Sequence, residues 1–129
     1  MESFQVRTGS RTEFVDITAR VRESLRSAGV DDGLCCVYVP HTTAGVTINE
    51  NADPAVQADI LKELNEIVPF DDGYAHTEGN SAAHIKASLM GSSVIVPVEG
   101  GEMALGTWQG IYFCEFDGPR SRRVYVFVR

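Results

Sequence analysis

Apolar and polar residues alternate along much of this 129-residue chain, which is the pattern of β-strands with one buried face. Short runs of β-branched and aromatic residues indicate further, more deeply buried strands. The predicted strands span residues 3–8, 13–17, 34–39, 45–49, 94–98, 107–116 and 122–128. Apolar residues recur at helical spacing in two segments, and a third, short helix is expected before Gly91. The predicted helices span residues 18–28, 54–67 and 82–90, the last being short.

Glycine, proline and aspartate place the ends of these elements. Gly29 ends the first helix, and Gly91 ends the short one. Asp53 followed by Pro54 is a strong helix start, and Asp53 is most simply the N-cap. Strands come in consecutive runs with helices inserted between them. This order favours a single α+β domain over residues 1–129, with antiparallel sheet rather than a doubly wound parallel sheet.

The net charge of −7 and the isoelectric point near 4.8 make a nucleic-acid partner unexpected. No apolar stretch approaches the roughly 18 residues of a membrane span, so no membrane partner is expected. The first residues lack the charged-then-apolar pattern of a secretory signal. Three cysteines without a C-x-x-C spacing suit small apolar residues rather than a zinc motif. We therefore expect a cytoplasmic protein.

The chain has only three histidines, and each lies beside turn residues. His41 follows the strand-ending Pro40, His76 lies in the polar segment 70–81, and His84 begins the short helix. Three imidazoles and a water suit a tetrahedral divalent ion, zinc more than magnesium. Spacing alone also permits separate histidines that only form hydrogen bonds at the surface.

Polar side chains gather on either side of the predicted strand 45–49. Thr42 and Thr43 precede it, and Asn49 and Glu50 lie at its other end. A carboxylate such as Glu50 can orient a histidine, act as a base or hold a cation. A solvated loop explains the same residues equally well.

In the predicted strand 107–116, Gln109 and Glu115 share one face with apolar residues between them. A carboxylate on such a face needs a partner, for which Arg120, Arg122 and Arg123 are the candidates. A structural ion pair and an active-site acid both fit this pattern. Arg120 follows a turn signal and suits a phosphate group.

Four sequence blocks resemble the YjbQ-type family, to which a secondary thiamine-phosphate synthase activity is attributed. The blocks are Pro40–Gly45, Ile48–Pro54, His76–Asn80 with His84, and Leu105–Ile111. They occur in the family's order and extend the resemblance over essentially the whole chain.

The resemblance implies an α+β fold of about seven strands in two packed, largely antiparallel sheets with two main helices, and a homotrimer. It implies a divalent metal held by His41, His76 and His84. It also implies a weak transferase that joins hydroxymethylpyrimidine diphosphate to thiazole phosphate and releases pyrophosphate. The partner expected is thus a small phosphorylated molecule.

We therefore predict three groups of site residues. The catalytic candidates are His41, Glu50, Gln109 and Glu115. The candidates for substrate or phosphate binding are Thr42, Thr43, Asn49 and Arg120. The metal ligands are His41, His76 and His84. An acidic chain with few clustered cations suits two phosphorylated substrates poorly, so the physiological substrate is open. The alternative is a non-enzymatic trimeric module that binds a metal or an anion.

Overall fold

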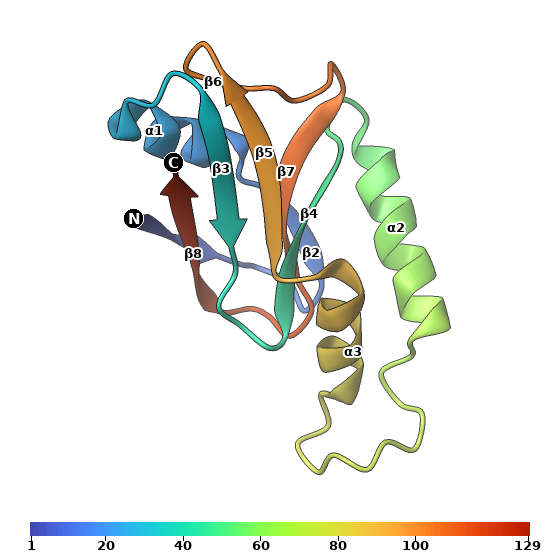
Figure 1. Cartoon of the computed structure of the whole chain (residues 1–129). Helices are drawn as coiled ribbons and strands as arrows, with labels where there is room; N and C mark the ends of the chain where they lie inside the picture. Colours follow the sequence, from blue (N-terminus) through green and yellow to red (C-terminus); the bar gives the residue numbers. More distant parts are fainter.

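The computed structural model describes all 129 residues. Its elements follow the predicted order (Figure 1). They are β1 (Glu2–Arg7), β2 (Glu13–Asp16), α1 (Thr18–Ala28), β3 (Gly33–Tyr38), β4 (Ala44–Glu50), α2 (Pro54–Ile67), α3 (Ser81–Met90), β5 (Ser93–Glu99), β6 (Glu102–Met103), β7 (Gln109–Glu115) and β8 (Ser121–Val128). The bounds of α1 and α2 are those predicted, and the other predicted elements differ by at most two residues at either end.

One strand was not predicted. β6 is only two residues long and pairs with the end of β5 across the turn at Gly100 and Gly101. Two residues are too few for an alternating pattern to be recognised. The chain thus forms eight strands where about seven were expected.

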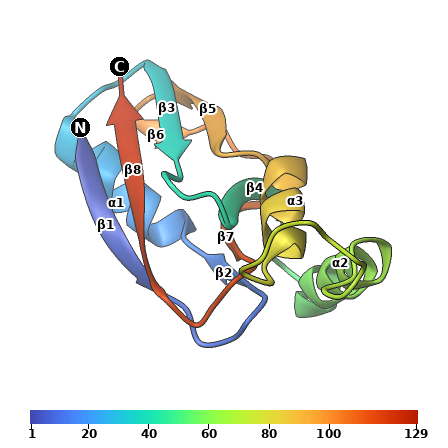
Figure 2. The same cartoon turned by 90° about the horizontal axis from the view of Figure 1, so that it is seen from below.

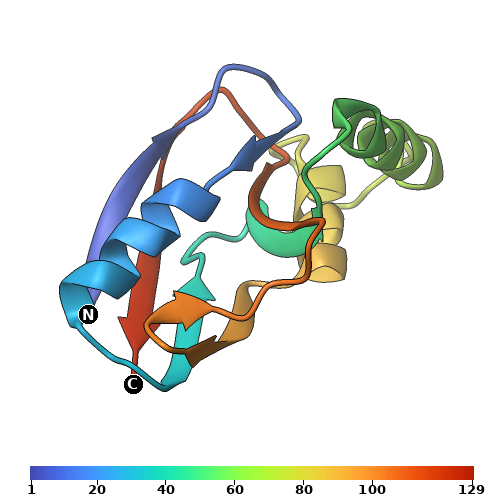
Figure 3. The same ribbon diagram turned by 90° about the horizontal axis from the view of Figure 1, so that it is seen from above.

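The strands form two sheets whose pairs are all antiparallel, which confirms the predicted α+β class. The larger sheet has the order β1-β8-β3-β5-β6, and the smaller one has the order β2-β7-β4. Helix α1 lies between the two sheets, whereas α2 and α3 lie on the far side of the smaller sheet (Figures 2 and 3). No helix in the structure is long and apolar enough to span a lipid bilayer.

Strand β7 is buried on both faces, as its sequence suggests. Ile111 and Phe113 belong to the main core between the sheets. Tyr112, Cys114 and Phe116 face the other way and pack with Leu64 of α2 and with Ala83 and Ala87 of α3. The second apolar cluster thereby fixes both helices on the smaller sheet.

The local signals place the helices as expected. Gly29 ends α1 in the left-handed conformation, with φ of 65°. Asp53 caps α2, since its side chain accepts a hydrogen bond from the N–H of Ala55 at 2.9 Å. Helix α3 lies against β4, where Val46 donates a hydrogen bond to the carbonyl of Gly91 at 3.1 Å. This contact brings α3 beside the turn that follows β3.

The outer face of the larger sheet carries no helix (Figure 1). Four of its large apolar side chains are 42–60% exposed, namely Leu34 and Tyr38 of β3, Ile95 of β5 and Phe127 of β8. Cys36 lies opposite both Ile95 and Phe127 in the strand register, so these side chains form one continuous patch. We call these five residues the sheet patch.

Candidate functional site

His41 lies in the turn after β3, beside β8 of the larger sheet. Its Nε2 accepts a hydrogen bond from the backbone N–H of Arg123, at 2.9 Å. Partial burial, followed by the charge of Arg122, lowers the pKa of this imidazole. The ring is therefore neutral at neutral pH, and because Nε2 is an acceptor its proton lies on Nδ1. His41 can donate one hydrogen bond to a ligand.

A polar cleft of about 470 Å³ separates His41 from α3. His84 reaches the cleft from the first turn of α3, and Ser88 follows one turn later on the same face. The cleft is lined by His41, Thr42, Ala44, His84, Ala87, Ser88, Gly91 and Ser92. Two imidazoles and several hydroxyls offer a small polar ligand both donors and acceptors.

His76 contacts the other side of His84. The two ring centroids are 5.5 Å apart and the rings are nearly perpendicular, at 88°. A second cleft of about 390 Å³ lies here, lined by Tyr74, Ala75, His76, Ser81, His84 and Ile85. His84 borders both clefts, so the structure brings the three histidines into one neighbourhood with His84 in the middle.

The residues of one chain do not fit the expected three-histidine metal site. No three His, Cys, Asp or Glu side chains are grouped so as to hold a metal ion. His41 also lacks a free lone pair, because Nε2 accepts the hydrogen bond from Arg123 and Nδ1 carries the proton. His76 and His84 supply at most two of the three protein ligands usual at a catalytic zinc.

Glu115, a catalytic candidate, lies in an internal ion pair and does not line the cleft. It is fully buried, and it pairs through both carboxylate oxygens with the Arg122 guanidinium. Thr8 donates a further hydrogen bond to the carboxylate at 2.8 Å. Burial opposes its ionisation, but hydrogen bonds from Arg122, the Asp117 N–H and Thr8 hold the pKa below its usual value. The structure thus supports the ion-pair interpretation and identifies Arg122 as the partner.

Two expected phosphate-binding residues are also engaged within the protein. Arg120 donates to the carbonyl and to the carboxylate of Asp117, at 2.8 and 3.1 Å, and does not line the cleft. Thr43 is buried, and its hydroxyl accepts a hydrogen bond from Arg122 at 2.9 Å. Thr42 is exposed and does line the cleft.

Asn49, Glu50 and Gln109 lie at the opposite end of the smaller sheet. In the β4–β7 register Glu50 is opposite Gln109, whereas Ala44, near His41, is opposite Glu115. The six steps of β4 separate the two ends by about 20 Å at the usual rise per residue. The side chain of Asn49 accepts from the Glu50 N–H at 2.7 Å, and that of Gln109 accepts from the Gly106 N–H at 2.8 Å. These three residues therefore do not join the histidines.

Ser88 lines the cleft but was not among the predicted site residues, although the sequence could have indicated it. It follows His84 by four positions in a predicted helix, a spacing that puts both on one face. Its hydroxyl donates to the carbonyl of His84 at 3.0 Å. Gly91 and Ser92 enter the cleft through the turn after α3, which has no comparable sequence signal.

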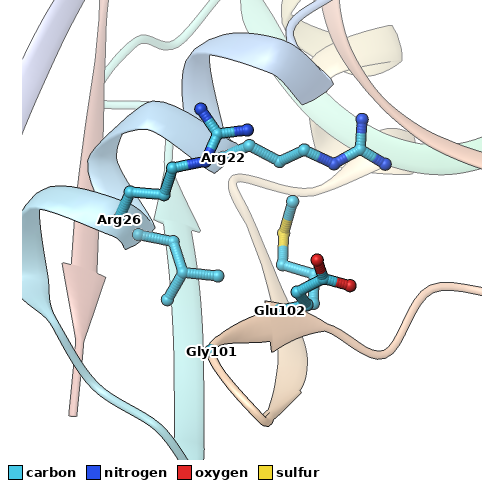
Figure 4. Close-up of a pocket in the computed structure, with 6 residues that line it drawn as sticks. Arg22, Arg26, Gly101 and Glu102 are labelled. Atoms are coloured by element: carbon cyan, nitrogen blue, oxygen red, sulfur yellow. The ribbon is translucent and has the colours of Figure 1, made fainter.

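A separate cavity of about 350 Å³ lies between α1 and the turn that joins β5 to β6 (Figure 4). Arg22 and Arg26 project from successive turns of α1, and Glu102 lies across from them. None of the predicted site residues borders this cavity. It offers exposed positions for control variants away from the histidines.

The chain is similar to known proteins over nearly its full length. The family model "UPF0047 protein YjbQ-like" matches residues 2–129. The UPF0047 protein YugU of Bacillus subtilis is 50% identical over 127 residues, which cover 98% of this chain and 96% of YugU. A UPF0047 protein of Methanocaldococcus jannaschii is 51% identical over 125 residues, which cover 97% of this chain and 91% of that protein.

Solved structures give the same result. The crystal structure of an uncharacterized conserved YjbQ/UPF0047 protein from Clostridium acetobutylicum is 53% identical, with a TM-score of 0.99 over 100% of both chains. That of a hypothetical protein from Aeropyrum pernix is 41% identical, with a TM-score of 0.95 over 99% of this chain and 96% of that one. Sequence and fold agree over the whole domain, and the chain belongs to the UPF0047 family of YjbQ-like proteins.

Proposed function

We propose that this protein is a transferase that binds a small phosphorylated molecule in the cleft between His41 and His84. One observation carries the proposal: two imidazoles and the hydroxyls of Thr42 and Ser88 line a single polar cleft. The reaction proposed is that of a secondary thiamine-phosphate synthase, which the sequence resemblance implies. The physiological substrate can be another phosphorylated molecule of similar size.

In this reaction the bond between the pyrimidine methylene carbon and the diphosphate oxygen breaks, and its electron pair leaves with pyrophosphate. The thiazole nitrogen supplies the electron pair of the new carbon–nitrogen bond. The Nδ1–H of His41 is suited to donate a hydrogen bond to the departing oxygen. No arginine lines the cleft. Arg120 binds Asp117, and Arg122 binds Glu115. Such a site stabilises the leaving charge weakly, so we expect a slow reaction.

A non-enzymatic metal-binding module is the second candidate function. The perpendicular rings of His76 and His84, with centroids 5.5 Å apart, favour it. Two imidazoles bound to one zinc ion have centroids about 5 Å apart at tetrahedral geometry. A third ligand must then come from a second subunit or from solvent, and we derive no chemical step from a metal here.

We also propose that the chain forms a homotrimer through the sheet patch. These apolar side chains are contiguous and lie in a sheet face that no helix covers. A contiguous apolar surface of this kind is typical of a protein interface. His41 binds the backbone of β8 beside the patch, so a neighbouring subunit would lie close to the cleft.

The enzymatic proposal is tested by assaying thiamine phosphate formation from the two phosphorylated precursors. We expect His41→Gln and His84→Gln each to lower the rate about 100-fold, the usual cost of one hydrogen-bond donor to a developing charge. Arg26→Gln, in the separate cavity, is the control and should leave the rate unchanged. Equal rates in all four proteins would refute a transferase site in this cleft.

The metal-binding alternative is tested separately by zinc titration of tag-free protein, followed by calorimetry. If His76 and His84 hold the ion, their glutamine variants abolish uptake while His41→Gln retains it. Uptake that requires His41 would instead mean that the Arg123 hydrogen bond opens and that all three histidines act as ligands.

A further inference from the structure

Lys86 is a fully buried cation without a carboxylate partner. It lies on α3, and its Nζ donates a hydrogen bond to Asn65 of α2 at 2.6 Å. A buried charge is costly unless other groups compensate it. One amide oxygen is incomplete compensation for an ammonium group with three donors.

The Phe70 ring offers a further attraction, although burial and then the charge of Arg11 lower the pKa of the Lys86 ammonium group to about 8. The Lys86 Nζ lies 3.7 Å from the centroid of the Phe70 ring. The Arg11 guanidinium carbon lies 3.6 Å from the same centroid. One aromatic ring thus contacts two cations, from the β1–β2 connection and from α3, and both are attracted to the negative face of the ring. We call these three residues the Phe70 clamp.

The Phe70 clamp holds one end of the segment that carries His76. Residues 68–80 connect α2 to α3 without forming a helix or strand. At its far end, Asn80 donates a hydrogen bond to Asp117 at 3.1 Å. Between these attachments His76 is exposed, and it contacts the carboxylate of Glu78 at 3.8 Å and the ring of His84. The position of His76 therefore depends on how the segment is anchored.

We propose that Phe70, which contacts both Arg11 and Lys86, is the positioning residue that fixes the 68–80 segment and keeps His76 against His84. Lys86 lies two residues after His84 on α3. The clamp therefore ties the segment to the same helix that carries the other imidazole. The consequence for activity rests on the proposed function, whereas the positioning of the two rings does not.

The proposal is tested by NMR of the histidine ring protons, which needs no substrate. The edge-to-face arrangement gives His76 and His84 ring-current shifts that disappear when the rings separate. Phe70→Leu keeps an apolar side chain but removes the aromatic face, so we expect these shifts to be lost. Phe70→Tyr restores the face and should retain them. The His41 ring, which is anchored by β8, serves as the internal reference.

Arg11→Gln provides a second route, because Arg11 is exposed and its loss opens no core cavity. We expect it to weaken the His76 and His84 shifts while circular dichroism stays unchanged. It also decides the test if Phe70→Leu fails to fold. Unchanged histidine shifts in every folded variant, or equal losses in Phe70→Leu and Phe70→Tyr, would overturn the proposal.

Activity then separates the two proposals. If Phe70→Leu loses the ring contact and thiamine phosphate formation falls about tenfold, the clamp positions groups that matter to the reaction. If the ring contact is lost in Phe70→Leu but His84→Gln does not change the rate, the positioning stands and the proposed function fails.

Discussion

Glu115 shows how much one residue's alternation pattern can reveal. Its place on an apolar strand face requires a positively charged partner, and the structure provides Arg122 with Thr8 and two backbone N–H groups. Three arginines were candidates because all follow β7 within a few positions. Within β8, Arg122 faces the core and Arg123 faces outward, because residues of a strand alternate. Arg120 precedes β8 and pairs with Asp117.

We predict that Glu115→Gln lowers the free energy of unfolding by about 3–5 kcal/mol, because it leaves the buried Arg122 without a counter-charge. Urea denaturation measures this change. The matched control is Glu23→Gln, whose carboxylate is exposed in a weak surface pair and should cost little. Similar losses in the two variants would contradict a dominant role for the internal pair.

Glu115→Gln should also change how the free energy of unfolding depends on pH in acid. The pKa of Glu115 is lower in the folded protein than its usual value near 4.5. The stabilisation that ionised Glu115 gives the folded protein is therefore complete above pH 4.5, and it is lost as the pH falls through the folded-state pKa. Glu115→Gln should show a shallower fall in stability below pH 4.5 than the wild type, measured by denaturation between pH 3 and 6. Asp117 retains part of the dependence, since its pKa is also lowered.

At the scale of elements, the contact of β4 with α3 builds the cleft. A side chain at Gly45 would place its Cβ 2.6 Å from the Gly91 carbonyl oxygen and 3.1 Å from the Met90 Cβ. Glycine is thus required for the close approach that sets His84 across from His41.

We predict that Gly45→Ala destabilises the fold by about 1–3 kcal/mol, as expected when a packed contact is forced apart. Thermal unfolding measures the loss, and the chemical shifts of His84 report the displaced helix. Gly9→Ala is the control, because the nearest atom to its added Cβ lies 3.9 Å away. A Gly45→Ala protein as stable as Gly9→Ala would mean that α3 is free to shift.

The length of β4 also explains why Asn49 and Glu50 do not lie beside the histidines. Asn49 and Glu50 are close to His41 in sequence, and all three residues lie in the blocks that resemble the YjbQ-type family. Yet β4 runs directly between them, and an extended strand of seven residues carries its ends about 20 Å apart. Their closeness in sequence suggested one site, but β4 places His41 and these two residues at opposite ends of the smaller sheet.

At the scale of the whole molecule, the sheet patch remains without a covering element (Figure 1). We predict a trimer by light scattering, and we expect Ile95→Asp to convert it to monomers because a charge cannot be buried in the patch without a partner. Ile67→Asp is a matched control, since Ile67 at the end of α2 is 61% exposed and Ile95 is 60% exposed.

Two results would reject this interface. Either the wild type is monomeric, or the two aspartate variants behave alike. If Ile95→Asp yields folded monomers, assays of these monomers also show whether the cleft needs a neighbouring subunit. Retained activity would place the whole site in one chain.

The sequence by itself determined the elements and their class. Alternation, helical spacing and capping residues are local properties of a chain, and they predicted every helix and all strands but the two-residue β6. The sequence blocks likewise indicated the family. The tertiary structure decided which polar residues meet. It joined His41, His84 and His76, assigned Glu115 to Arg122, and separated Glu50 and Gln109 from them. Such contacts depend on strand register and helix placement, which pair residues far apart in sequence, so local patterns alone could not single out the partners.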